Sequence, residues 1–375
     1  MAKPLRLGIV GAGSIALRSP LAHIAVGDVS DRIVFGAICD PVPGRAKAAA
    51  EKFGVPQSFE SFDEMIAKGE FDIATVCSPI GVHFDQGMKL VAAGKHIHFN
   101  KTMTTTKDEA DQLIDSAAKS RVKLVASPGQ MLRPPFLRIR KLIQDGAIGT
   151  LAWAVTGAGF GDYHQNEGVR QGNDVLTNID PSWYFRKPGG GPLYDMTVYG
   201  LHTMTGVLGP AKRVTAMSGV LLRERDFKGK LVACDMDDNT VILVDWGNSV
   251  FGFVHGTAVG SLSGFGAPTY FGTKGTIAGA QLNGKKIDYP GSDRDPNGNG
   301  VGLTKHATGK HGQMGEMHVY EDLMQLVDLV LEGIPTVATA EHARHVIEIF
   351  DAAYRSAATG QAQALTSTFT PPPGA

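Results

Sequence analysis

A strand, a glycine-rich turn and the start of a helix follow one another between Leu5 and Ala16, and this succession constrains the fold more than any other segment. Gly11 permits a tight turn out of the strand, and Gly13 lets backbone amides approach a pyrophosphate closely. The small side chain of Ala16 allows the helix to pack tightly on the sheet. The pattern therefore predicts a dinucleotide-binding βαβ unit.

Asp40 ends the next apolar run, residues 33–39, and stands 24 residues after Ala16. An acidic residue at this strand end accepts hydrogen bonds from the ribose hydroxyls of NAD and repels the 2′-phosphate of NADP. We therefore expect NAD, with NADP as the less favoured cofactor. Arg45 follows shortly afterwards and leaves two interpretations open. Its guanidinium either neutralises a 2′-phosphate or lies on the solvated surface of a helix over residues 45–53.

Short apolar runs alternate with helical patterns from Leu5 to about Ser127, as in a doubly wound parallel sheet. The expected strands cover residues 5–10, 33–39, 73–77, 96–99 and 123–126, and the expected helices include 84–93 and 107–119. Ligands of such sheets bind beyond the carboxyl ends of the strands. Residues that follow those ends should therefore meet at one site. They are Asp40, Ser78-Pro79, Asn100-Lys101 and Gly129-Gln130.

We predict two domains, a dinucleotide-binding domain over residues 1–127 and a second α/β domain over 128–375. In the second domain the expected strands cover 151–157, 214–220, 239–244, 249–256 and 276–280, with helices over 137–144, 317–332 and 341–359. Hairpin turns are expected at 245–248 and 272–275, and a long loop at 284–315. These elements predict an open, mostly antiparallel sheet with helices on one face. Its other face needs burial, so we expect a homodimer or homotetramer.

A formal net charge of −1 over 375 residues argues against nucleic acid or an acidic membrane surface as a partner. The sequence shows no signal peptide and no apolar run long enough to cross a bilayer, so a cytoplasmic location is expected. The 3 cysteines and 12 histidines lack the spacing of metal ligands, and we expect no metal.

Two further segments carry residues suited to chemistry. Lys101 follows the strand over 96–99, where a lysine can touch both cofactor and substrate, although a surface lysine before the next helix is an equal interpretation. Asp195, Tyr199 and His202 come after a run of three glycines and are spaced i, i+4 and i+7, which predicts one helix face carrying all three. The alternative is that neither residue is catalytic. Tyr199 would then be a packing residue, and Asp195 a first-turn carboxylate that the helix dipole stabilises.

The chain resembles the Gfo/Idh/MocA oxidoreductase family over almost its full length. The matching motifs are Gly11-x-Gly13-x-x-Ala16, Ser78-Pro79 with His83, Ala93-Gly94-Lys95-His96, Lys101, Ala147-Ile148-Gly149, and Gly189-Gly190-Gly191 with Asp195. The resemblance implies a nicotinamide domain, an α/β domain with an open sheet, and oxidation of a secondary hydroxyl on a sugar, cyclitol or sugar derivative. Lys101 matches the lysine of the family's Glu-Lys-Pro motif, and Asp195 with Tyr199 matches its Asp-x-x-x-His motif.

Two departures from the family pattern concern the chemistry directly. Asn100 and Thr102 replace the glutamate and proline beside the lysine. Tyr199 stands where most members have a catalytic histidine, as in the glucose-fructose oxidoreductase and dihydrodiol dehydrogenase branches. We expect Tyr199 to act as acid or base, with its pKa lowered by Lys101 and the nicotinamide. His202, one turn further on, is an alternative base or a substrate ligand.

The candidate residues form three overlapping groups. The expected catalytic residues are Lys101, Asp195, Tyr199 and His202. Lys101 polarises the substrate oxygen, and Asp195 binds the substrate and orients Lys101. The expected cofactor-binding residues are Gly11, Gly13, Ser14, Ile15, Asp40, Arg45, Ser78, Pro79, His83, Asn100, Lys101 and Gln130. The expected substrate-binding residues are Lys101, Arg133, Trp183, Asp195, Tyr199 and His202.

Two other functions are compatible with the same residues. In the first, NAD stays bound while one carbon is oxidised and re-reduced, so that an elimination, a glycosidic cleavage or an epimerisation proceeds through a keto-sugar. In the second, the protein is a sensor that binds a dinucleotide without catalysis.

Overall fold

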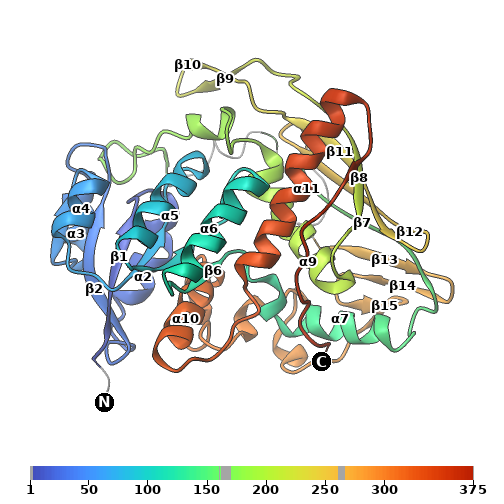
Figure 1. The fold of residues 1–375 in the computed structure, drawn as a ribbon. Helices are drawn as coiled ribbons and strands as arrows, with labels where there is room; N and C mark the ends of the chain where they lie inside the picture. Colours follow the sequence, from blue (N-terminus) through green and yellow to red (C-terminus); the bar gives the residue numbers. More distant parts are fainter. Residues whose placement is uncertain (1–2, 160, 162–169, 261–266, 375) are drawn as a thin grey trace.

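The computed structural model describes residues 3–159, 161, 170–260 and 267–374. Two sheets, each with helices packed on it, stand next to each other, and both are visible in Figure 1. The first sheet has six parallel strands in the order β3-β2-β1-β4-β5-β6. These strands are β1 (Leu5–Val10), β2 (Ile33–Cys39), β3 (Gln57–Phe59), β4 (Ile73–Val76), β5 (His96–Phe99) and β6 (Leu124–Ala126).

The register of the first sheet aligns the carboxyl ends of its central strands. Val10 pairs with Cys39 on one side and with Val76 on the other. The predicted doubly wound parallel sheet is therefore confirmed. The strand β3 was not predicted, because three residues of mixed polarity carry no periodic signal.

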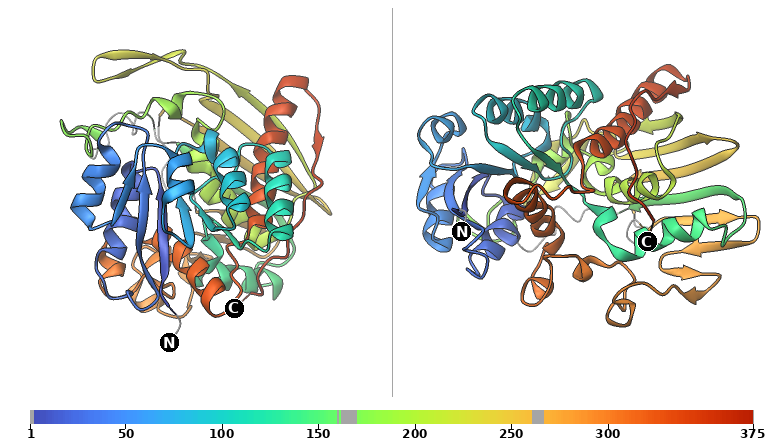
Figure 2. Two further views of the ribbon diagram at one scale, coloured as in Figure 1. Left: turned by 60° about the vertical axis from the view of Figure 1, so that its left-hand side comes forward. Right: turned by 60° about the horizontal axis from the view of Figure 1, so that its bottom comes forward.

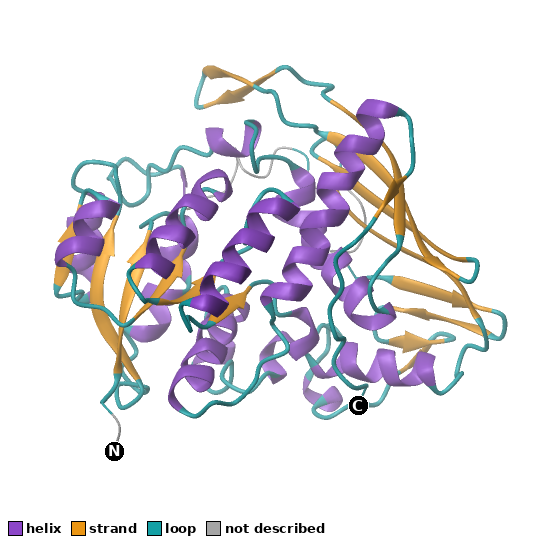
Figure 3. Ribbon diagram, in the orientation of Figure 1, coloured by secondary structure: helices purple, strands orange, loops and turns teal. Residues whose placement is uncertain are grey.

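Helices cover both faces of this sheet, as Figure 3 shows. They are α1 (Ser14–Arg18), α2 (Pro20–Ile24), α3 (Arg45–Phe53), α4 (Phe62–Lys68), α5 (His83–Ala92) and α6 (Lys107–Lys119). A capping box starts α6, since the Thr106 side chain accepts a hydrogen bond from the Glu109 amide and the Glu109 carboxylate accepts one from the Thr106 amide.

One further helix, α10 (Met317–Leu331), returns from the far end of the chain to the first sheet. Its buried side chains Tyr320, Leu323 and Leu326 join the same apolar cluster as Leu7 and Ile9 of β1. The division into domains at 1–127 and 128–375 stays a prediction. The helix α10 belongs to the second range in sequence but packs on the first sheet.

The second sheet has nine strands in the order β16-β15-β14-β13-β7-β12-β11-β8-β17. Among the strands in the described residues, only β7 and β12 pair in parallel, so the sheet is mostly antiparallel, as predicted. Its strands are β7 (Leu151–Gly159), β8 (Arg213–Gly219), β11 (Asn239–Gly247), β12 (Val250–Thr257), β13 (Thr269–Gly272), β14 (Gly275–Ala278), β15 (Gln281–Leu282), β16 (Lys285–Lys286) and β17 (Gln363–Ala364). A separate hairpin consists of β9 (Glu224–Phe227) and β10 (Lys230–Ala233).

Three helices pack on one face of the second sheet, and Figure 2 shows its strands extending past them. They are α7 (Pro134–Gln144), α9 (Val198–Leu208) and α11 (Ala340–Thr359). Side chains alternate along the strands, so Ile242 and Val254 lie in the core while Leu243 and Phe253 are exposed on the other face. The open face thus keeps a row of large apolar side chains. Its members are Trp153, Met217, Leu243, Phe251 and Phe253.

The sequence placed the hairpin between β11 and β12 at residues 245–248, whereas the turn lies slightly later. Asn248 and Ser249 both have positive φ, at 53° and 61°, and β11 continues to Gly247. A register irregularity between Asp245 and Gly247 accommodates the extra residue. The predicted turn at 272–275 is confirmed between β13 and β14.

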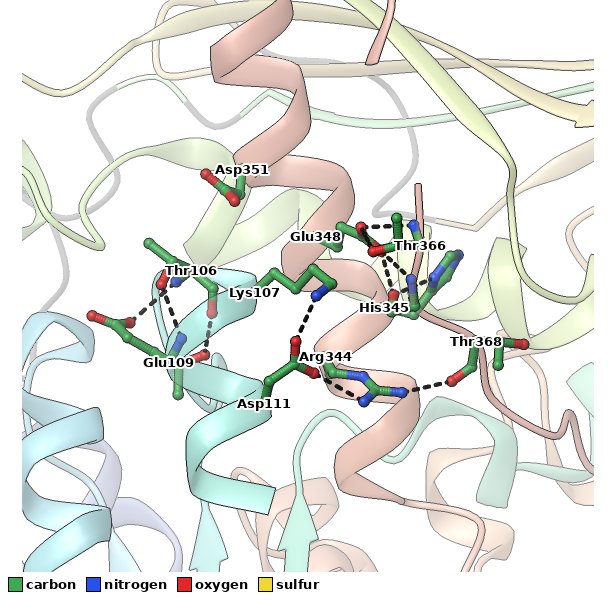
Figure 4. Close-up of polar contacts among 12 residues, drawn as sticks. Thr106, Lys107, Glu109, Asp111, Arg344, His345, Glu348, Asp351, Thr366 and Thr368 are labelled. Carbon is green, nitrogen blue, oxygen red and sulfur yellow. Dashed lines mark hydrogen bonds and ion pairs between the residues drawn. The ribbon is translucent and has the colours of Figure 1, made fainter. Parts of the chain in front are cut away.

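Polar contacts join α6 of the first domain to α11 and the C-terminal segment, as Figure 4 shows. Arg344 bonds Asp111 of α6 at 3.0 Å and the Thr368 carbonyl at 3.0 Å. Glu348 accepts hydrogen bonds from the amides of Thr366 and Ser367 at 2.8 Å each. The segment after β17 is therefore fixed to α11. Within the described residues, no helix has the length and apolar character of a membrane span.

Candidate active site

The glycine-rich turn lies between β1 and α1, where the strand ends converge. Gly11 has φ +91°, and a Cβ atom on it would lie 3.0 Å from the Ser78 amide nitrogen, so only glycine fits. A Cβ on Gly13 would meet nothing within 4 Å, which leaves the backbone at the start of α1 open. This is the geometry that a helix N-terminus needs to receive a phosphate.

Asp40 lies beside this turn and is almost fully buried. Its carboxylate accepts hydrogen bonds from the amides of Ala12 and Val42, each at 2.9 Å. Arg45 lies 3.5 Å from the Asp40 carboxylate and donates to the Val175 carbonyl at 3.0 Å. The guanidinium is thus tied to Asp40 and to the segment of Val175, which follows β7.

Three other expected cofactor residues shape the backbone around the strand ends. His83 is buried and bridges two carbonyls, that of Thr102 and that of Ser78, each at 2.8 Å. Asn100 accepts a hydrogen bond from the Lys101 amide at 2.9 Å, and the peptide between Lys101 and Thr102 is cis. His83 therefore connects the segment of Ser78 with the segment of Lys101 and Thr102. Pro79, next to Ser78, is exposed.

Lys101 meets two of its expected partners. Its Nζ lies 2.5 Å from Asp195 Oδ1 and 5.4 Å from the centre of the Tyr199 ring. Asp195 is 2% exposed and Tyr199 is 8% exposed. Asp195 belongs to a π-helical turn, Leu193–Thr197, that precedes α9, and such turns widen a helix locally and occur often at functional sites. The structure therefore brings Lys101, Asp195 and Tyr199 together.

Burial and charge act in opposite directions on these groups. Burial alone would lower the pKa of Lys101, but Asp195 and Tyr199 outweigh it, so the pKa of this ammonium is raised above its usual value. Burial raises the pKa of Tyr199 to about 12, and Lys101 and Arg133 offset this only in part. The expected lowering of the tyrosine pKa is therefore wrong for the protein alone, because desolvation outweighs the nearby cations.

His202 does not join this group. It is fully buried, and its ring stacks on His342 of α11 with centroids 3.6 Å apart. Among the described residues neither ring nitrogen of His202 has a hydrogen-bond partner. Burial lowers the pKa of His202 to about 3, so its imidazole stays neutral. His202 lies in the regular part of α9 and packs against His342 of α11 rather than beside Lys101.

Arg133 and Trp183 differ in how closely they approach the centre. Burial lowers the pKa of Arg133 to about 10, while Asp322 and Tyr199 act in the opposite direction, which places this guanidinium near the tyrosine. Trp183 is half-buried and stacks on Tyr184, with the ring centroids 3.7 Å apart. Tyr184 itself raises the pKa of Lys101, although less than Tyr199 does, so it is a second aromatic neighbour of the lysine charge.

His318 is a site residue that the sequence did not reveal. Its Nε2 lies 3.2 Å from Tyr199 Oη, and the two rings meet edge to face. Glu316, two residues earlier, lies 3.7 Å from His318 Nδ1. Both precede or begin α10, far from Tyr199 in the sequence, and no local spacing links them to the glycine-rich segment.

These residues fit a dinucleotide with a nicotinamide. Gln130 donates to Thr203 Oγ1 at 3.3 Å through its amide nitrogen. Its Oε1 is buried and has no partner within the described residues, so it suits an amide donor such as the nicotinamide carboxamide. Across the described ranges, no group of three or more histidine, cysteine, aspartate or glutamate side chains is arranged to hold a metal.

Comparison with known proteins agrees with this geometry. Residues 5–127 match the oxidoreductase family GFO_IDH_MocA, described as an NAD-binding Rossmann fold, and residues 136–278 match the GFO/IDH/MocA C-terminal domain. The chain belongs to the Gfo/Idh/MocA oxidoreductase family.

Curated relatives and solved structures extend the comparison. D-glucoside 3-dehydrogenase of Escherichia coli (strain K12) is 28% identical over 221 residues, which is 57% of this chain and 58% of that protein. Inositol 2-dehydrogenase of Rhizobium meliloti (strain 1021) is 26% identical over 222 residues, 58% and 59% of the two chains. The matches thus span less than two thirds of these relatives. The WlbA dehydrogenase of Bordetella pertussis, solved with NADH and UDP-GlcNAcA, has a TM-score of 0.76 at 18% identity over 98% of this chain and 99% of that one, and shares the fold.

Proposed function

We propose that this protein is an NAD-dependent dehydrogenase that oxidises a secondary hydroxyl of a sugar, cyclitol or sugar derivative. The observation that carries the proposal is the buried group of Lys101, Asp195 and Tyr199 next to the dinucleotide turn. A fixed ammonium beside a phenol is the pair that alcohol oxidation needs, since one group binds the oxygen and the other exchanges its proton. The names of the D-glucoside and inositol dehydrogenase relatives support the substrate class.

In this mechanism Asp195 holds the Lys101 ammonium, and Lys101 donates a hydrogen bond to the substrate oxygen as negative charge develops there. Tyr199 exchanges the hydroxyl proton. NAD, when bound, would supply the hydride acceptor for this oxidation. Arg133 and Tyr184 flank the centre and would contact the remaining hydroxyls of the ring. We assign His202 a packing role against His342.

Residues around the first sheet would hold the cofactor. Gly11, Gly13 and the first residues of α1, Ser14 and Ile15, would receive the pyrophosphate, and Asp40 the adenosine ribose. We propose NAD over NADP because Asp40 occupies the ribose position and Arg45 is already tied to the Asp40 carboxylate and the Val175 carbonyl. The Gln130 amide would face the nicotinamide.

The test is a panel of sugars, inositols and glycosides, with NAD and NADP in parallel, read by the absorbance of reduced nicotinamide. We expect turnover with at least one cyclic polyol and preference for NAD. The variant Asp40→Ser should raise the KM for NAD by about tenfold or more, because a charged hydrogen-bond acceptor for the ribose is lost. Equal use of NADP by the unchanged protein would contradict the cofactor proposal, and no turnover with any polyol would contradict the reaction.

One observation favours a second candidate function, in which NAD remains bound between turnovers. Leu176 packs into the apolar cluster of the first domain, and Arg45, which lies 3.5 Å from the Asp40 carboxylate, donates a hydrogen bond to the Val175 carbonyl. This segment covers the adenosine end of the proposed site. Turnover of a glycoside without added NAD, together with NAD in the purified protein, would favour this function over the dehydrogenase.

We also propose that the open face of the second sheet forms a homodimer or homotetramer. Phe251 and Phe253 are 52% and 38% exposed at the centre of this face, and Trp153 stacks on Phe271 beside them. An apolar row of this kind is characteristic of an interface. We expect an oligomer in sedimentation analysis and a monomer after Phe251→Glu. Leu231→Glu, on the separate hairpin, should leave the oligomer intact; an unchanged oligomer in both variants would refute this interface.

A further inference from the structure

Tyr199 has a half-buried hydrogen-bond partner that the reaction described above does not use. His318 Nε2 lies 3.2 Å from Tyr199 Oη. The Lys101 ammonium lies on the ring face of the same tyrosine, 5.4 Å from its centre. Tyr199 is thus placed between a cation that would bind substrate and an imidazole that can take or return a proton.

The other nitrogen of His318 faces a carboxylate that is itself fixed. Glu316 Oε2 lies 3.7 Å from His318 Nδ1, and Glu316 Oε1 forms an ion pair with Arg18 at 2.6 Å. Glu316 has φ 54°, a left-handed conformation that a glutamate seldom adopts. Ser19 Oγ donates to the Glu316 carbonyl at 3.0 Å and helps to hold this conformation. The contacts of Glu316 thus place its carboxylate toward His318.

The same ion pair connects the carboxylate to the dinucleotide turn. Arg18 Nε donates to Ser14 Oγ at 3.2 Å, and Ser14 is the first residue of α1. Arg18, Glu316 and His318 therefore form a series of polar contacts between the phosphate-binding turn and the hydroxyl of Tyr199, and the longest separation in it is the 3.7 Å between Glu316 and His318.

We propose that Tyr199, His318 and Glu316 form a proton relay that carries the substrate hydroxyl proton to solvent, with Arg18 as a positioning residue for Glu316. This inference rests on the proposed dehydrogenase function. Its first three atoms are Tyr199 Oη, His318 Nε2 and His318 Nδ1, and its last is Glu316 Oε2. The Glu316 side chain is 21% exposed, so water can reach the end of the relay.

The proton steps balance as follows in alcohol oxidation. The substrate O–H bond breaks as a new O–H bond forms on Tyr199, while the original Tyr199 proton moves to His318 Nε2. The proton on His318 Nδ1 moves to Glu316 Oε2, and Glu316 releases it to water. The electron pair of the substrate C–H bond leaves with the hydride to NAD, the oxidant of the proposed function. His318 begins and ends neutral, having exchanged one tautomer for the other.

The surroundings of Tyr199 and His318 explain why the proton passes along a relay instead of leaving an ionised tyrosine or histidine. Burial keeps the pKa of Tyr199 at about 12, and burial with the nearby cations Arg133 and Lys101 lowers the pKa of His318 to about 3. Neither a phenolate nor an imidazolium is therefore favoured at neutral pH. Concerted transfer through both neutral groups avoids the two charged states. The 3.7 Å separation at Glu316 is compatible with this role, since catalytic hydrogen bonds are often longer before substrate binds.

The kinetic test is a double-mutant cycle with an oxidisable polyol. We expect His318→Gln and Glu316→Gln each to lower kcat by about tenfold or more, with the KM for the alcohol unchanged, because only proton transfer is impaired. In a Tyr199→Phe background, His318→Gln should cause no further loss. Glu332→Gln, at the opposite end of α10, is the matched control and should keep full activity. Full activity in His318→Gln, or losses that multiply in the double variant, would overturn the relay.

A second measurement needs no turnover and so separates failure of the relay from failure of the proposed function. Nitrogen-15 NMR of the unchanged protein at neutral pH, with His318→Gln used to assign the signal, reports the tautomer of His318. The relay requires a proton on Nδ1 and none on Nε2, because Nε2 must accept from Tyr199. The opposite tautomer, or an imidazolium, would overturn the relay even if the protein proves to be an active dehydrogenase.

Discussion

Lys101→Met is expected to lower kcat for alcohol oxidation by about 10²- to 10³-fold, the loss typical of removing one preorganised donor to a developing oxyanion. Methionine keeps the length of the aliphatic stem but cannot donate a hydrogen bond. The substitution also leaves Asp195, which is 2% exposed, without its ion-pair partner. NAD binding, measured by calorimetry, should change much less than kcat, because the phosphate-binding turn is untouched.

Two controls separate chemistry from folding in this experiment. The double variant Lys101→Met with Asp195→Asn removes both charges, and it should recover stability but not activity. Lys141→Met removes a surface lysine whose partner is Asp145, and it should behave like the unchanged protein. Retention of kcat in Lys101→Met would remove the lysine from the mechanism and weaken the dehydrogenase proposal itself.

A large effect on stability is expected from the buried carboxylate of Asp322. It is 1% exposed, and it accepts hydrogen bonds from Ser127 Oγ at 2.5 Å and from the Gly129 amide at 3.1 Å. Burial nevertheless raises the pKa of Asp322 to about 7. In the unfolded chain the same carboxyl titrates near its ordinary value of about 4.

The sign of the pH effect follows from proton binding. Between about pH 4 and about pH 7 the folded protein keeps the Asp322 proton that the unfolded chain releases, so stability falls as pH rises through this window. A difference of about three pH units corresponds to a loss of about 4 kcal/mol that is complete above the folded pKa. The loss arises because ionisation places a charge where water cannot reach it.

Urea unfolding at about pH 5 and about pH 8 checks this expectation. The unchanged protein should lose stability between these pH values, and Asp322→Asn, which cannot ionise, should lose about 3 kcal/mol less, because about two of the three pH units of the window lie above pH 5. Asp31→Asn, on the surface, is the control and should show the slope of the unchanged protein. Parallel pH profiles for the unchanged protein and Asp322→Asn would show that this carboxyl ionises normally.

The first half of the fold could be predicted because its physical signals are local. Buried parallel strands such as β4 are unbroken apolar runs, and the turn at Gly11 needs a backbone that only glycine adopts. The acid at the end of β2 follows from the same local pattern. The alternating strands of the second sheet were predicted, whereas β9, β10 and β13 were not, because their four-residue sequences show no clear alternation of apolar and polar side chains.

The candidate site was only partly predictable because its contacts are not local. The meeting of Lys101 with Asp195 followed from motif positions, but the position of His202 depends on its packing against His342 of α11, which no local spacing reveals. The contact of Tyr199 with His318 spans 119 residues, and no spacing in the sequence announces it. The pKa of Tyr199 was misjudged because sequence shows neighbouring charges but not the depth of burial that opposes them.

The position of α10 has a consequence for how the chain matures on the ribosome. The apolar surface around Leu7 and Ile9 is completed by Tyr320 and Leu323, which are synthesised more than 300 residues later. Asp322 of the same helix ties the segment after β6 into place. The nucleotide-binding half therefore cannot finish its core during its own synthesis. Until residue 331 emerges, the nascent chain exposes an apolar surface of the kind that chaperones shield.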